Sequence, residues 1–392
     1  MESRRIDCGS APVSAHASCF RGASGVNEFH LILEPRDEGD FEEQLAWLER
    51  AYVITLETLG ISLHGAVFRR FFCGDVLNQT EALKARAFSN PRRSGEPCAV
   101  SWIGQAPLPP AKVALWAYHV SDPAGAIEKV FDGSTLTVSR GELSHHWSTG
   151  LCAALNDTPH AQTQAILEQY DGYLGEKKMI LAENLIRTWF FVRDVDENYG
   201  GLVAARREFF ARRGLTPETH FVASTGIEGV PAEAGALVSL DAYAVGGVRD
   251  EQVEYLSALG HLSHTHVYGV TFERGTSVAY RDRKHVILSG TASIDCKGEI
   301  VHPGDVARQL ERTLENMAAL LATAGATLDD MCHFLVYVRE PEDRAEVWRC
   351  MRERFEATPM VVVVGPVCRP GWLVEIEGMA VVDTCEEGLP VF

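Results

Sequence analysis

Apolar positions in the last third of the chain follow a regular succession of helical and strand patterns. Apolar residues recur every three or four positions over residues 305–322, which predicts an amphipathic helix that Gly325 ends. Short apolar or alternating runs bounded by Gly, Pro and charged residues predict strands. The predicted elements are a helix over 305–322, a strand over 331–338, a helix over 346–355, and strands over 360–364 and 373–382.

The same order occurs twice more upstream. The second copy has helices over 161–174 and 200–212 and strands over 185–192, 220–223 and 236–245, and the first has helices over 41–59 and 78–88 and strands over 66–72 and 112–119. Phe191-Val192-Arg193-Asp194 corresponds to Tyr337-Val338-Arg339-Glu340. A repeat of about 100 residues has the size of a small domain. The pattern therefore predicts three tandem α/β (α+β) units, each a mixed sheet backed by two helices.

Stretches rich in Gly, Asp and Ser separate the units. The predicted domains are 26–122, 140–247 and 262–384, and the last is expected to carry the active site. Residues 1–25 are small and polar, which indicates a flexible tail. The tail contains Arg4 and Arg5 but no apolar segment of the kind that a secretory signal needs.

Charge narrows the class of function. The chain has 36 Lys and Arg against 54 Asp and Glu, a formal net charge of -18. Such a surface disfavours nucleic acid and anionic membranes as partners. No run reaches the roughly 18 apolar residues that a membrane span needs. The ten cysteines are scattered without a Cys-x-x-Cys pair, which suits a reducing compartment. We therefore expect a cytoplasmic protein that acts on a small molecule.

Histidines provide the best candidate for a metal site. His261, His264 and His266 share one predicted loop, and His145 and His146 are adjacent elsewhere. No carboxylate stands at ligand spacing beside them, so hydrogen-bonded loop or cleft histidines are expected instead of zinc ligands.

Several short motifs in the last two units resemble those of a known fold family. Ser289-Gly290-Thr291-Ala292-Ser293, the later Gly304-Asp305 and the closing Val374-Glu375-Ile376-Glu377 are similar to the RidA/YjgF fold. Within that superfamily the chain resembles the chorismatases most closely. The shared features are Tyr199 through Arg206, Ala223-Ser224-Thr225-Gly226, Tyr268-Gly269 with Arg274, and Cys368-Arg369 followed by Leu373-Val374-Glu375-Ile376.

This resemblance implies an architecture and an activity. Single-unit members form trimers with sites between subunits, so three units in one chain imply an internal pseudo-trimer and a monomer, with further assembly left open. The implied enzyme, of secondary metabolism, is a lyase or hydrolase that cleaves the enolpyruvyl ether of chorismate or a related cyclic carboxylic acid. Its products would be pyruvate and a hydroxybenzoate or a dihydroxy-diene acid.

The resemblance also implies the site residues. Glu375 corresponds to the proposed acid that protonates the enolpyruvyl methylene, and a cysteine at position 368 is found in members that make 3-hydroxybenzoate. No metal or organic cofactor is implied. The expected substrate-binding residues are Arg206, Arg274, Arg369, Tyr268, Thr225, Gly226, Ser289 and Gly290.

Two other functions stay open. RidA-type deaminases have an arginine two residues after the proline of the penultimate strand, where this chain has Ala99, Thr219 and Val361. A divergent imine or enamine deaminase would instead use Glu375 or Glu377 to position water. A non-catalytic ligand-binding protein is the third hypothesis.

Each candidate residue also has a purely structural interpretation. Two glutamates at positions i and i+2 could line the wet face of a strand, Cys368 could be an inert thiol, and Arg206 could belong to a solvated helix face.

Overall fold

The computed structural model describes residues 1–93, 95–155 and 157–392, and three sheets built to one plan form its centre. Written from the first strand of each unit, the orders are β1-β2-β3-β6-β4-β5, β7-β8-β9-β13-β10-β11 and β14-β15-β16-β19-β17-β18, with β12 added at the edge of the first. In every sheet only the pair β4–β5, β10–β11 or β17–β18 is parallel. The prediction of three tandem units of mixed α/β structure is confirmed.

The strands have the following bounds. The first sheet contains β1 (Glu2–Ile6), β2 (Val13–Arg21), β3 (Asn27–Pro35), β4 (Ala66–Cys73), β5 (Ala99–Gly104), β6 (Val113–Ser121) and β12 (Val230–Pro231). The second contains β7 (Glu128–Phe131), β8 (Thr135–Arg140), β9 (Leu143–Cys152), β10 (Leu185–Val192), β11 (Ala223–Glu228) and β13 (Val238–Gly246). The third contains β14 (Val253–Tyr255), β15 (Gly275–Ala279), β16 (Arg283–Ala292), β17 (Met331–Val338), β18 (Met360–Val364) and β19 (Val374–Asp383).

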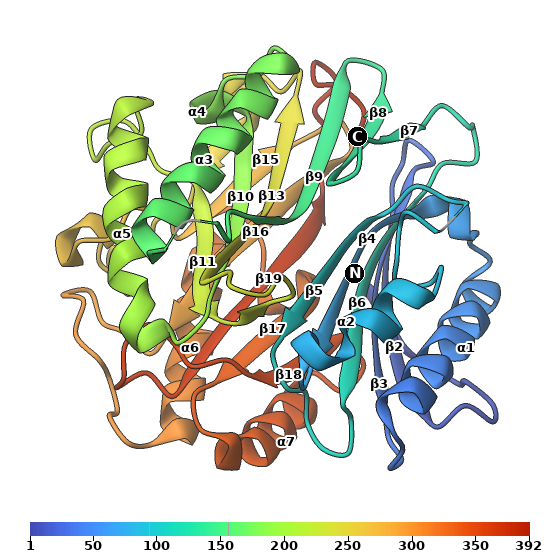
Figure 1. Cartoon of the computed structure of the whole chain (residues 1–392). Coiled ribbons are helices and arrows are strands. Elements are labelled where there is room, and N and C mark those ends of the chain that lie inside the picture. The colour runs from blue at the N-terminus through green and yellow to red at the C-terminus, as the bar shows by residue number, and fades with distance from the viewer. Residues whose placement is uncertain (94, 156) are drawn as a thin grey trace.

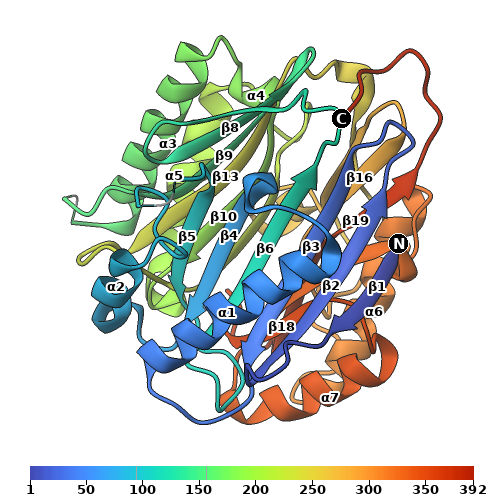
Figure 2. The same ribbon diagram turned by 90° about the vertical axis from the view of Figure 1, so that its right-hand side faces the viewer.

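Helices cover the outside of the sheets (Figures 1 and 2). Among the described residues, each unit has two helices of at least ten residues. The helices are α1 (Phe41–Leu59), α2 (Val76–Ala85), α3 (Pro159–Glu176), the short α4 (Leu181–Asn184), α5 (Val195–Arg212), α6 (Val306–Thr323) and α7 (Arg344–Arg354). Local chemistry sets their ends. Asp40 and Glu43 form a capping box at the start of α1, and Gly60 ends it in the left-handed conformation at φ 67°. None of the helices in the described part of the chain combines the length and apolar content needed to cross a membrane.

The inner faces of the three sheets meet around a common axis and form one apolar core. Trp116, Trp147 and Trp189 come together there, although they belong to two different sheets. Smaller cores lie between the first two sheets and their own helices. Each central strand is therefore covered on both faces, which explains why polar side chains within it are buried.

The expectation of a flexible tail over residues 1–25 is wrong. β1 and β2 lie within it, and β2 pairs with β3 along its whole length. The Ser18 hydroxyl donates to the Cys332 carbonyl oxygen of the third unit at 2.7 Å. Small residues such as Ala15 and Ala17 give β2 only a weak pattern of apolar positions. Both are buried, and their small side chains let the neighbouring layers on the two faces of β2 pack closely against it.

Other differences concern the stretches between predicted units. β7 and the start of β8 lie in residues 123–139, and β14 lies in residues 248–261, so these segments are parts of sheets. β5 was not predicted, and the strand expected over 220–223 is β11 instead, at Ala223–Glu228.

Candidate active site

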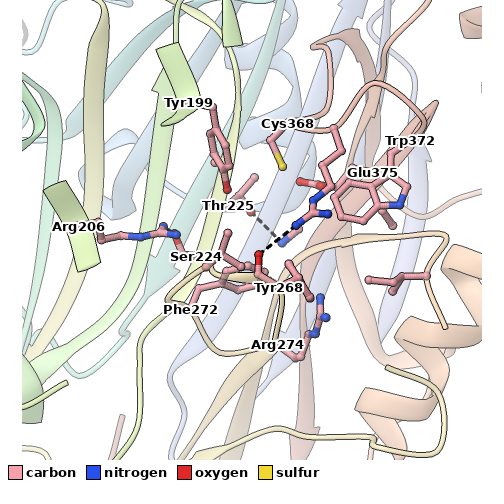
Figure 3. A pocket seen from close by; sticks show the side chains of 16 residues that line it. Tyr199, Arg206, Ser224, Thr225, Tyr268, Phe272, Arg274, Cys368, Trp372 and Glu375 are labelled. Carbon is pink, nitrogen blue, oxygen red and sulfur yellow. Dashed lines mark hydrogen bonds between the residues drawn. The ribbon is translucent and has the colours of Figure 1, made fainter. Parts of the chain in front are cut away.

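A pocket between the second and third sheets collects nearly all of the predicted site residues (Figure 3). It contains about 490 Å³ of atom-free space, part of it open to solvent. Of the predicted residues, Glu375, Cys368, Arg206, Arg274, Arg369, Tyr268, Thr225, Gly226 and Gly290 line it. Ser289 lies just behind the wall, where its hydroxyl accepts a hydrogen bond from the Ser224 amide at 2.9 Å.

Glu375 is an acid held in a dry setting. It lies on β19 in the middle of the third sheet and is only 6% exposed. Burial raises the pKa of Glu375 to about 8, and the charge of Glu377 raises this pKa further, while Arg187 and Arg274 oppose both. The carboxyl group is therefore protonated and uncharged near neutral pH.

Glu377, two residues further on the same strand, is held by a dense set of donors. Its carboxylate accepts hydrogen bonds from Trp189 at 2.8 Å, from Thr225 at 2.8 Å, and from Tyr337 and Arg187. Arg187 comes from β10 of the second unit, so this buried ion pair joins the two units directly behind the pocket. The prediction that these glutamates line a wet strand face is wrong, because both faces of β19 are covered.

Glycines make room for the large side chains of the pocket. A Cβ at position 290 would lie 2.1 Å from Oε1 of Glu375, and a Cβ at position 226 would lie 2.9 Å from the ring of Tyr199. The Gly290 amide donates to the Thr225 hydroxyl at 2.9 Å. Gly290 is therefore required for the position of the Glu375 carboxyl.

A Gly290→Ala substitution tests this requirement. The added methyl group must displace the Glu375 carboxyl, so any turnover that depends on this acid should fall by at least about tenfold, because small misplacements of reacting groups are costly. Steady-state rates of the reaction under test measure the effect. Gly172→Ala, on the outside of α3 with nothing within 4 Å, is the control and should keep its rate. Equal rates for the two variants would contradict the role given to Gly290.

Three arginines face the pocket without an acidic partner among the described residues. Arg206 is 1% exposed, donates from Nε to the Thr271 hydroxyl at 3.1 Å and from Nη1 to the Ser224 hydroxyl at 3.2 Å, and leaves its buried Nη2 unpaired. Arg274 donates to the Ser263 carbonyl oxygen from Nε at 3.2 Å and from Nη2 at 2.9 Å.

The third of these arginines lies at the mouth of the pocket. Arg369 donates to the Tyr268 carbonyl oxygen at 3.2 Å, and its guanidinium stacks on the rings of Tyr268 and Trp372. Because a buried cation without a counter-charge is costly, this set of arginines is built to receive an anion. The interpretation of Arg206 as part of a solvated face is wrong.

Cys368 lies beside Tyr199 and close to Glu375 (Figure 3). Burial raises the pKa of the Cys368 thiol to about 12, so the sulfur is protonated at neutral pH and is a weak nucleophile. Burial likewise raises the pKa of Tyr199. The thiol is thus a neutral part of the wall.

The segment 256–274 covers one side of the pocket and contributes Tyr268, Val270, Phe272 and Arg274. His261, His264 and His266 belong to this segment but do not line the pocket. His145 and His146, the other two candidate metal ligands, are buried in the second sheet, where they contact the hydroxyls of Tyr243 and Tyr173 at 2.8 and 2.7 Å.

Sequence reasoning missed the importance of Arg187 and of Trp189. A charged residue inside the strongly apolar run Leu185–Val192 was the available signal, because such a residue needs a buried partner. The partner could not be identified, since Glu377 lies 190 positions away.

Comparisons with known proteins agree with the fold. A family model described as endoribonuclease L-PSP matches residues 275–382. A RutC family protein of Pyrococcus abyssi is 35% identical over 107 residues, which are 26% of this chain and 84% of the relative.

Two curated relatives from Streptomyces hygroscopicus match a longer stretch. One named chorismatase is 31% identical over 215 residues, and one named 3-hydroxybenzoate synthase is 28% identical over 216. Each match covers 50% of this chain, but only 61% and 63% of the relatives. A crystal structure of a chorismatase superposes with a TM-score of 0.60 at 21% identity, over 81% of this chain and 93% of that chain, which shows a shared fold.

Proposed function

The chain belongs to the RidA/YjgF superfamily, and on that premise we propose that the pocket between its second and third sheets cleaves the enolpyruvyl ether of chorismate or of a related cyclic carboxylic acid. One observation carries the proposal. A buried carboxylic acid whose pKa is raised to about 8 shares a pocket with three arginines that have no acidic partner among the described residues. Chorismate has two carboxylates and one acid-labile vinyl ether, so it requires both features.

The arginines would bind and orient the substrate. Guanidinium groups form paired hydrogen bonds to carboxylates, and the unpaired Nη2 of Arg206 is available for one of them. The guanidinium of Arg274 lies over the rings of Tyr268 and Phe272, and that of Arg369 lies over the rings of Tyr268 and Trp372, which restricts their orientation. Their positive charge also attracts a dianion to a chain that is otherwise strongly negative.

Glu375 would start the reaction by donating its proton to the methylene carbon of the enolpyruvyl group. This forms an oxocarbenium ion at the ether carbon, which water attacks while Glu375 takes back a proton. In the resulting hemiketal the bond to the ring oxygen breaks as the hemiketal hydroxyl loses its proton and the ring oxygen gains one, which releases pyruvate together with a dihydroxy-diene acid. A general acid of pKa near the working pH suits such a step.

Cys368 is relevant to which ring product is released together with pyruvate. Release of 3-hydroxybenzoate corresponds to loss of the ring hydroxyl and aromatisation, with no net water consumed. The relative named 3-hydroxybenzoate synthase supports this outcome, and so does the cysteine next to the acid.

The direct test is to incubate the purified chain with chorismate and to follow pyruvate and the ring products by chromatography. Pyruvate with 3-hydroxybenzoate supports roles for both Glu375 and Cys368. Pyruvate with a dihydroxy-diene acid supports Glu375 alone. Ammonia release from freshly made imino acids, without pyruvate from chorismate, would overturn the proposal in favour of a deaminase.

The rate should depend on pH through Glu375. The acid form is required, so kcat should be level below about pH 7 and fall about tenfold per pH unit above pH 8. Because the folded state binds this proton more tightly than a group with the ordinary pKa of 4.5, the contribution of Glu375 to stability decreases as pH rises from about 4.5 to 8.

A Glu377→Gln variant is the companion measurement. It removes a negative charge that raises the pKa of Glu375, so the fall in kcat should begin at lower pH. A pH profile that is identical in the variant and the parent would contradict this electrostatic coupling.

A further inference from the structure

A second cleft lies between the first and second sheets, at the place that corresponds to the candidate active site by the internal repeat. Strand registers define the correspondence. On β13, Ser239 pairs with Phe191, as Glu375 of β19 pairs with Tyr337. On β5, Ser101 takes the place that Thr225 has on β11. Both Ser101 and Ser239 line the second cleft.

The cleft has neither an acid nor a thiol at the positions that correspond to Glu375 and Cys368. Ser239 takes the position of the acid Glu375. The segments 229–237 and 365–373 each have nine residues before the equivalent strands β13 and β19, and Ala232 in the first takes the position of Cys368 in the second. The cleft therefore lacks an acid at the position from which Glu375 faces the first pocket.

The second cleft nevertheless has a buried acid–arginine pair, as the first pocket has in Glu377 and Arg187. Asp241 corresponds to Glu377 and is likewise paired with an arginine of the preceding unit, since Arg70 donates to it at 2.8 Å. The Gly150 amide also donates to Asp241 at 2.8 Å. Ser101 and Ser239 are 3% and 5% exposed, and neither hydroxyl has a hydrogen-bond partner among the described residues. Two hydroxyls that line the cleft are thus left to bind a ligand.

The interface between the third and first sheets shows that the repeat alone does not produce a polar lining. Between the third and first sheets, the positions of Ser101 and Ser239 are taken by Val361 and Ala114, both fully buried. Apolar packing closes that position, so within the described residues the polar lining at this position is present at the other two interfaces.

The walls of the second cleft are aromatic and open. Trp102 takes the position of Gly226, and Thr80 on α2 takes the position of Tyr199 on α5. The large aromatic ring therefore belongs to a strand in the second cleft and to a helix in the first pocket. The long covering segment 256–274 is replaced by the turn 132–134 next to Phe131. As a result the cleft has about 1440 Å³ of atom-free space, including open solvent.

Cations gather at its rim. Lys84, Arg92 and Arg93 line the cleft, opposed by the exposed Glu233. Arg92 has no side-chain partner among the described residues, whereas Lys84 contacts Glu81 at 3.0 Å. In a chain of net charge -18, these three cations form a local surface that attracts anions, because the carboxylate of Asp241 behind them is already paired with Arg70.

We propose that this cleft is a second binding site for a small ring-bearing carboxylate, which it holds without converting. The ring would stack on Trp102 and Phe131, the carboxylate would meet Arg92 and Arg93, and the hydroxyls of Ser101 and Ser239 would bind ring substituents. This inference does not depend on the reaction proposed for the first pocket.

Calorimetric titration of the full chain with 3-hydroxybenzoate as the probe tests the proposal. Two sites are expected. An Arg92→Glu/Arg93→Glu variant should lose one of them, with at least about a tenfold drop in affinity because two attractive charges become repulsive. An Arg206→Gln variant should lose the other. Arg308→Glu/Arg354→Glu makes the same charge change on the exposed surfaces of α6 and α7 and should keep both sites.

The outcomes separate this proposal from the proposed function. One site that is lost only in the Arg92→Glu/Arg93→Glu variant supports the second cleft and counts against product binding in the first. A stoichiometry unchanged in that variant overturns the second cleft, as does equal competition by inorganic sulfate, which would mean a surface attraction to any anion. Thermal melting of each variant verifies that the fold is intact, and Arg92→Gln/Arg93→Gln repeats the test without added negative charge.

Discussion

Replacement of Glu375 by Gln is expected to lower the turnover of chorismate by about 100- to 10,000-fold, the range that a general acid contributes. Glutamine has nearly the same shape and can still donate a hydrogen bond, but its amide cannot transfer a proton to carbon. Because the carboxyl is already neutral near pH 7, the substitution creates no uncompensated charge. The variant should therefore melt normally. Steady-state pyruvate release and thermal unfolding, measured on the same preparation, give both quantities.

Glu34 supplies the matched control. Burial raises the pKa of Glu34 to about 7, and this carboxyl lies beside Arg352, away from the pocket. Glu34→Gln removes a similarly perturbed acid and should keep the parental rate. A Glu375→Gln variant that keeps its activity would remove Glu375 from the role of acid, even with the fold intact.

Replacement of Arg187 by Met should produce the largest loss of stability. The substitution leaves Glu377 buried at 2% exposure with its charge unpaired, and breaking such a pair costs about 3–5 kcal/mol in the free energy of unfolding. Urea denaturation measures this loss. The same change should shift the pH at which kcat falls to higher values, because Arg187 lowers the pKa of Glu375.

Two further variants make the result specific. Arg187→Met combined with Glu377→Gln removes both charges but keeps an amide oxygen as acceptor for Trp189, Thr225 and Tyr337, so it should regain most of the stability. Arg349→Met breaks an exposed pair with Glu353 and should cost less than about 1 kcal/mol. If Arg187→Met were no more harmful than Arg349→Met, the ion pair would not hold the two units together.

The repeated order of helices and strands could be predicted because it depends on local periodicity. The helix over 41–59 and the strands over 331–338 and 360–364 have the predicted bounds, since strong apolar patterns and terminal residues such as Asp40 and Gly60 act within a few positions. β1 and β2 escaped prediction because their small and polar residues become buried only when other strands cover them.

The amino-acid sequence by itself determined the three-unit plan and the residue types of the candidate site, because motifs such as Cys368-Arg369 and Ser289-Gly290 are local and the apolar neighbours of Glu375 are adjacent to it. Only the tertiary structure decided which units enclose a pocket, that both faces of β19 are dry, and that Arg187 pairs with Glu377. The physical reason is that burial and Coulomb interactions depend on distance in space, and no local pattern encodes the meeting of side chains 190 positions apart.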